Sequence, residues 1–222
     1  MKLAEKVNVM RASVMGANDG ILSVAGIVIG VAGATSNSYA ILLSGLSGML
    51  AGTVSMAMGE YVSVNSERDG QRQAIARESR ALDNDYQGEF DFIQHKYEQT
   101  GISPDLAKQA THEMLTRDAL NIAVRERYGF DLNEKASAIA AALASMISFP
   151  TGSILPLVAI SVFPPAIKVI ATVIAVIIAL SLTGYTAAAL GHANRGKAML
   201  RNVVSGVLTM AVTYGIGTLF AH

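Results

Sequence analysis

The sequence has no cysteine and no tryptophan among its 222 residues. Without cysteine, the chain cannot form disulfide bonds, thiolate zinc sites or iron–sulfur clusters, and it has no cysteine nucleophile. Charged residues are also few, at 15% of the chain, whereas 51% of the residues are hydrophobic. No segment carries the dense positive charge that neutralises phosphate groups, so we expect no nucleic-acid partner.

The zero net charge of the chain is the sum of two regions of opposite sign. Residues 67–134 hold 14 of the 17 acidic residues and nine of the 17 basic ones. The rest of the chain therefore has three acids and eight bases. This separation predicts that the acidic region and the sparsely charged remainder meet different surroundings.

Long stretches without charge predict five transmembrane helices. Residues 20–59 contain no Lys, Arg, Asp or Glu, and residues 136–194 contain only Lys168. About twenty apolar residues cross the roughly 30 Å hydrocarbon core of a bilayer. Polar or proline-containing turns divide these stretches. The predicted spans lie near residues 16–34, 39–66, 136–162, 166–190 and 199–221.

The predicted fold class is all-α: a polytopic membrane protein with five transmembrane helices and a cytoplasmic helical insert between spans two and three. Residues 1–66 hold an N-terminal amphipathic segment and spans one and two, residues 67–134 the insert, and residues 135–222 spans three to five. Lys and Arg gather on one side of these spans, and the positive-inside rule makes that side cytoplasmic. The N-terminus is then cytoplasmic and the C-terminus lies on the opposite side. Glycines in spans one, two and five favour a tight bundle or a dimer.

Three residues are candidates for an ion pathway within the membrane. Asp19 borders the uncharged part of span one, where a carboxylate is costly unless it is paired, hydrated or bound to a cation. An N-cap of the first span is its structural alternative. Met56 and Glu60 are four residues apart on one face of span two. A thioether beside a carboxylate favours Fe(II), Mn(II) or Co(II) over Mg(II) or Ca(II).

The insert offers a second set of candidate metal ligands. Apolar residues at helical spacing over 82–97, and Ser103 and Pro104 before another helix, predict a helical hairpin. On a continuous helix, Glu78 and Glu89 would share one face with Asp85. Carboxylates converging from two helices suit a divalent first-row metal, although a hydrated acidic surface gives the same pattern. The candidate ligands are Glu78, Glu89, Met114 and Asp118, with Asp85, His112 and Glu113 as secondary candidates.

Three sequence runs make the chain resemble the vacuolar iron transporter family of five-span divalent-metal/proton exchangers: GANDGIL at 16–22, GMLAG at 48–52 and MAMGEYVSV at 56–64. The resemblance covers essentially the whole chain. It implies a homodimer whose ion path runs between the first spans of the two subunits. Asp19 and Met56 would bind metal in this path, with Glu60 nearby.

The resemblance also implies a cytoplasmic metal-binding hairpin. Glu78, Glu89 and Met114 match its ligands, and Asp118 stands where a glutamate is usual. The chain departs from the pattern at three positions where further ligands are expected: Ala81, Phe92 and Leu115. The insert would then bind fewer ions, bind them more weakly, or recruit Asp85, His112 or Glu113 instead.

The resulting hypothesis is a secondary transporter rather than an enzyme. It would exchange cytoplasmic Fe(II) for protons across a lipid bilayer and so contribute to iron homeostasis, with Mn(II), Co(II) and Zn(II) as further candidate ions. A membrane-bound ferroxidase and a non-transporting metal-sensing membrane protein are the alternatives. A short chain without a long N-terminal extension fits a prokaryotic plasma membrane better than a vacuole, and no cleavable signal peptide is evident.

Overall fold

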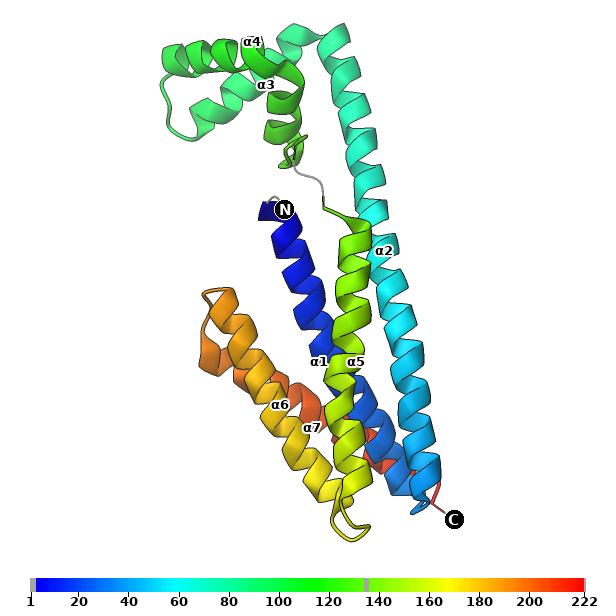
Figure 1. Cartoon of the computed structure of the whole chain (residues 1–222). Coiled ribbons are helices and arrows are strands. Elements are labelled where there is room, and N and C mark those ends of the chain that lie inside the picture. The colour runs from blue at the N-terminus through cyan, green and yellow to red at the C-terminus, as the bar shows by residue number, and fades with distance from the viewer. Residues whose placement is uncertain (1–2, 134–135, 222) are drawn as a thin grey trace. The chain divides into compact units, whose positions relative to one another are not determined.

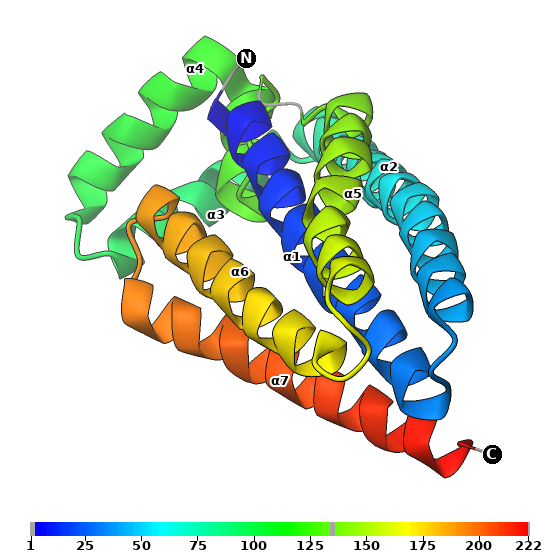
Figure 2. The same ribbon diagram turned by 60° about the horizontal axis from the view of Figure 1, so that its bottom comes forward.

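The computed structural model describes residues 3–133 and 136–221, and every regular element in this part of the chain is an α-helix (Figures 1 and 2). By contacts, the chain forms two compact units. The membrane unit comprises the described residues of Lys6–Val62 and Ser137–His222, and the hairpin unit those of Met1–Glu5 and Ser63–Ala136. The helices are α1 (Leu3–Ala34), α2 (Ser38–Asn84), α3 (Tyr86–Gln99), α4 (Pro104–Tyr128), α5 (Ala138–Val162), α6 (Lys168–Leu190) and α7 (Arg195–Leu219).

Five of the described helices are long and apolar enough to cross a membrane: α1, α2, α5, α6 and α7. This finding confirms the prediction of five spans in an all-helical, multi-pass protein. Large apolar side chains such as Ile147, Val158 and Ile178 are exposed. Such exposure suits a helix that faces lipid, because hydrocarbon chains solvate apolar side chains as well as a protein core does.

Two helices extend well beyond their predicted spans. Helix α1 runs unbroken from Leu3 to Ala34, so the predicted N-terminal amphipathic segment is the first part of this helix. Helix α2 has 47 residues, from Ser38 to Asn84, and is about 70 Å long at 1.5 Å per residue. No proline interrupts residues 38–84, so nothing in the chain forces the helix to end where span two was expected to end.

Helix α1 contributes a large share of the core of the membrane unit. Val24 and Val28 on α1 are fully buried, and the same apolar cluster contains Phe149 from α5 and Leu180 from α6. The hydroxyl of Ser153 on α5 donates a hydrogen bond of 3.2 Å to the carbonyl oxygen of Gly20 on α1. Helices α6 and α7 lie side by side (Figures 1 and 2).

One close approach of helices gives a test of this packing. A side-chain carbon added at Gly217 on α7 would overlap the carbonyl group of Gly30 on α1, whereas one at Gly215 would meet open space. We expect Gly217→Ala to cost roughly 1–3 kcal/mol through overpacking. In a chain of this size the melting temperature of the detergent-purified protein should fall by roughly 2–12 °C. Gly215→Ala is the matched control, and equal melting temperatures for the two variants would contradict the packing of α1 against α7.

In the hairpin unit, α3 and α4 pair around a small apolar core. Phe90 and Ile93 from α3 meet Leu115 and Ala123 from α4. Helix α4 begins at Pro104, as the sequence indicated. It ends at Tyr128, and the positive φ of 78° at the following Gly129 is a conformation that glycine adopts without strain.

The chain turns at Asp85, which separates α2 from α3. The backbone of Asp85 is non-helical, and its Oδ1 accepts a hydrogen bond of 2.9 Å from the amide of Gly88, so Asp85 caps α3. Glu78 therefore lies on α2 and Glu89 on α3. The expectation that the three acids share one face of a single helix is wrong, because the cap ends the first helix between them.

Candidate functional site

Asp19 is an exposed carboxylate in the interior of α1. Its Oδ1 accepts a hydrogen bond of 3.3 Å from the hydroxyl of Ser23, one turn further along the helix. The N-cap interpretation of Asp19 is wrong, because α1 begins at Leu3. A carboxylate on the surface of a predicted membrane span requires water, a cation or a second protein surface.

Asn18 fixes the direction in which Asp19 points. Its Oδ1 accepts hydrogen bonds from Asn202 Nδ2 on α7, at 3.1 Å, and from the hydroxyl of Thr183 on α6, at 3.4 Å. Consecutive residues of a helix are about 100° apart. With Asn18 directed at α6 and α7, Asp19 is directed to a different side of α1. Sequence reasoning missed these three residues, although polar side chains within apolar spans are a known signal for contacts between membrane helices.

A cavity of about 280 Å³ opens beside Asn18 in the membrane unit. Its walls come from α1, α6 and α7 and from the Ala193 turn, and they include Met15, Gly184 and Arg201. The residue next to Asp19 thus borders a cavity with both polar and apolar walls.

Glu60 is only 8% exposed, and it forms an ion pair with an arginine of another helix. Arg11 Nη2 on α1 lies 3.0 Å from Glu60 Oε2 on α2. Met56, one turn before Glu60, is half-buried and packs against the core of the membrane unit. The sequence indicated the shared face of Met56 and Glu60 but not Arg11, which is 49 residues away from its partner.

Glu78 and Glu89 come together in the hairpin unit through Arg127. Arg127 Nε lies 3.2 Å from Glu78 Oε2, and Arg127 Nη2 lies 2.5 Å from Glu89 Oε2. Burial raises the pKa of Glu78, and so does the neighbouring Glu89 carboxyl group, whereas Arg127 opposes this rise. Arg127 therefore forms ion pairs with two of the predicted metal ligands at once.

The remaining ligand candidates of the hairpin unit have other local partners. Asp118 interrupts the helical backbone of α4, and its Oδ1 accepts a hydrogen bond of 3.3 Å from the amide of Asn121. Glu113 is exposed and accepts a hydrogen bond from Gln109 at 3.2 Å, and the neighbouring His112 is exposed. Within residues 3–133 and 136–221, no three His, Asp or Glu residues are close enough to hold one metal ion.

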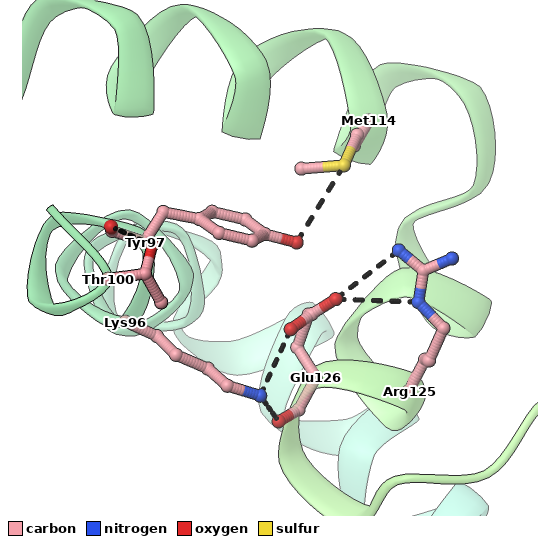
Figure 3. Close-up of polar contacts among 6 residues, drawn as sticks. All are labelled: Lys96, Tyr97, Thr100, Met114, Arg125 and Glu126. Atoms are coloured by element: carbon pink, nitrogen blue, oxygen red, sulfur yellow. Dashed lines mark hydrogen bonds and ion pairs between the residues drawn. The ribbon is translucent and has the colours of Figure 1, made fainter. Parts of the chain in front are cut away.

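Met114 borders a second charged cluster, which sequence reasoning did not find (Figure 3). The hydroxyl of Tyr97 lies 3.9 Å from the sulfur of Met114. Lys96 Nζ and Arg125 Nη2 lie 3.0 Å and 3.2 Å from carboxylate oxygens of Glu126 (Figure 3). Lys96 also donates a hydrogen bond to the backbone carbonyl of Glu126. These contacts fasten the end of α3 to the last turn of α4.

This cluster predicts a pH-dependent stability of the hairpin unit. Burial alone would raise the pKa of Glu126, but hydrogen bonds with Lys96 and Tyr97 hold it below the ordinary value of 4.5. A lowered carboxyl pKa stabilises the folded state above pH 4.5, and this stabilisation is lost as the pH falls below that value. We expect Glu126→Gln to destabilise α3 and α4 at pH 7 by roughly 1–3 kcal/mol, and by less at pH 4.

Amide hydrogen exchange of α3 and α4 would measure this difference. Asp91→Asn, which neutralises an exposed acid of α3, is the control. An effect of Glu126→Gln that is the same at pH 7 and pH 4 would contradict the assignment to its charge.

Comparisons with known proteins agree with the membrane architecture. A profile of the VIT family matches residues 10–218. The chain is 32% identical over 211 residues to a vacuolar iron transporter from Acanthamoeba castellanii, an alignment that covers 95% of this chain and 78% of the relative. It is 35% identical over 212 residues to vacuolar iron transporter homolog 1 from Oryza sativa subsp. japonica, covering 95% and 73%. Vacuolar iron transporter homolog 2 from Arabidopsis thaliana is 31% identical over 208 residues, with 93% and 82% covered.

Proposed function

Because the chain belongs to the VIT family, a family of transporters, we propose that it is a secondary transporter that moves Fe(II) out of the cytoplasm in exchange for protons. The observation that carries this proposal is the exposed carboxylate of Asp19 in the interior of an apolar helix. A carboxylate at such a place is costly, and it is typical of an ion pathway. The names of the relatives support iron as the transported ion, and Mn(II), Co(II) and Zn(II) are further candidates.

The proposed pathway uses Asp19 and Met56 as metal ligands, with Glu60 beside them. A carboxylate oxygen binds either a metal ion or a proton, so the arrival of one favours the release of the other. Protonation of Asp19 or Glu60 from the far side of the membrane would therefore release the metal ion there. Arg11 holds Glu60 in the structure, and Glu60 would exchange this partner during transport.

We also propose that the protein acts as a homodimer. A second copy placed against α1 would cover Asp19, which is exposed in the single chain. Two facing copies would bring two Asp19 carboxylates to one interface, where a divalent cation balances both charges. The ion pathway would then lie between the two α1 helices.

The hairpin unit is proposed to be a cytoplasmic insert that captures metal before transport. Glu78 and Glu89 are its first candidate ligands, because they already lie within reach of one cationic group. This placement makes the N-terminus cytoplasmic and puts the C-terminus on the opposite side. A prokaryotic plasma membrane is the proposed location.

Uptake of metal by proteoliposomes tests the proposed function. Vesicles with the purified protein and an acidic interior should accumulate Fe(II), and the same assay with Mn(II), Co(II) and Zn(II) would give the selectivity. Empty vesicles, and vesicles without a pH gradient, are the controls. Binding of metal without uptake would instead support a metal sensor. Consumption of oxygen on addition of Fe(II), without uptake, would support a ferroxidase.

A further inference from the structure

Four residues from three helices form what we term the Arg127 cluster: Glu78, Glu89, Phe92 and Arg127. Glu78 lies near the end of α2, Glu89 and Phe92 lie on α3, and Arg127 lies in the last turn of α4. The guanidinium group of Arg127 contacts one carboxylate oxygen of each glutamate, at 3.2 Å and 2.5 Å. All the members belong to the hairpin unit.

The two carboxylates are buried and depend on a cation. Glu78 is 1% exposed and Glu89 is 9% exposed. Two carboxylates that share a buried site repel each other unless a positive charge lies between them. Arg127 supplies this charge, and its planar group donates to both carboxylates from separate nitrogen atoms.

The guanidinium group of Arg127 also lies over the aromatic ring of Phe92. The central carbon of this group lies 4.0 Å from the centroid of the Phe92 ring, a distance typical of a cation–π interaction. Arginine stacks on an aromatic ring without losing its in-plane hydrogen bonds. The ring therefore favours arginine in this position over a small hydrated cation.

The cluster still lacks one interaction that a metal ion could provide. Glu78 Oε1 is buried and has no hydrogen-bond partner. An unpaired oxygen of a buried carboxyl group is costly, and a divalent ion would bind it.

We infer that Arg127 is a built-in cation that competes with divalent metal for Glu78 and Glu89, so that metal binds this pair only by displacing the guanidinium group. The inference rests on the proposed capture of metal by the hairpin unit. It adds a residue that sets the metal affinity of that site. The competition lowers the affinity of this pair for metal.

Binding of Mn(II) to the full-length, detergent-purified protein tests this inference, with the loss of the free Mn(II) signal in electron paramagnetic resonance as the readout. Arg127→Gln should bind Mn(II) at least about tenfold more tightly than the wild type, since removing the guanidinium group leaves two buried carboxylates without a cation. The additional tight binding should disappear when Glu78→Gln is combined with Arg127→Gln.

Two further variants separate competition from general effects on the fold. Arg125→Gln removes the neighbouring arginine, which pairs with Glu126 instead, and should leave Mn(II) affinity unchanged. Phe92→Leu keeps Arg127 but removes its aromatic support, and should tighten Mn(II) binding a few-fold. This milder variant provides the test if Arg127→Gln does not fold.

The inference is overturned if neither Arg127→Gln nor Phe92→Leu binds Mn(II) more tightly than the wild type. Uptake of Fe(II) by proteoliposomes, measured on the same preparations, separates this failure from that of the proposed function. Unchanged Mn(II) binding together with normal uptake would reject only the role of Arg127. Absence of uptake in the wild type would reject the transporter.

Discussion

Replacing Asp19 with asparagine is expected to lower Fe(II) uptake by proteoliposomes at least about tenfold. Mutations of residues that only contact a metal ligand already lower metal affinity or activity by about this factor. Asparagine has nearly the same size and can accept the same hydrogen bond from Ser23. It lacks the negative charge that attracts the metal ion, and it cannot exchange a proton. The initial rate of uptake at a fixed pH gradient is the measurement.

A companion change at Met56 tests the other proposed ligand of the pathway. Met56→Ala should also lower the rate of Fe(II) uptake, although by less, because a neutral thioether is a weaker ligand than a carboxylate. Met58→Ala is the matched control, since Met58 is 55% exposed and lies on another face of α2. Normal uptake in both Asp19→Asn and Met56→Ala would reject the proposed pathway.

Replacing Glu60 with glutamine is expected to uncouple metal transport from the proton gradient. Exchange of one proton across a gradient of one pH unit supplies about 1.36 kcal/mol, which corresponds to tenfold accumulation of the metal. Vesicles with the wild-type protein should reach at least about tenfold accumulation under this gradient. Vesicles with Glu60→Gln should equilibrate Fe(II) without accumulating it, because the side chain of glutamine does not titrate and so cannot exchange a proton.

Replacing Glu67 with glutamine is the control for the change at Glu60. Glutamine at position 60 can still accept a hydrogen bond from Arg11, so the contact between α1 and α2 is retained. Glu67 is an exposed acid one heptad further along α2, and Glu67→Gln should leave the accumulation ratio unchanged. Full accumulation of Fe(II) by Glu60→Gln would assign the coupling to another group, with Asp19 as the remaining candidate.

The membrane helices could be predicted from the sequence because their signal is local. Residues 20–59 have no charge, and the cost of burying backbone in lipid leaves helices as the only way for such a stretch to cross a bilayer. The ends of helices were less predictable, since they depend on single residues. The side chain of Asp85 caps α3 and thereby ends α2 nearby, whereas a periodic pattern alone would continue through it.

The ion pairs of the candidate carboxylates could not be predicted, because they join residues that are distant in the sequence. Arg11 and Glu60 are 49 residues apart, and Glu89 and Arg127 are 38 residues apart. Spacing along one helix identifies residues on the same face, but it does not identify the partner that tertiary packing brings to that face. The sequence thus indicated the carboxylates, and only the structure revealed the arginines that hold them.

Following both ions in the same vesicles would show whether exchange of Fe(II) for protons is coupled. Proteoliposomes with an acidic interior and a trapped pH indicator would receive Fe(II) from outside. Fe(II) is expected to enter while the interior pH rises, and both signals are expected to be lost in Asp19→Asn. Entry of Fe(II) without any rise in interior pH, or binding of Fe(II) without entry, would contradict coupled exchange.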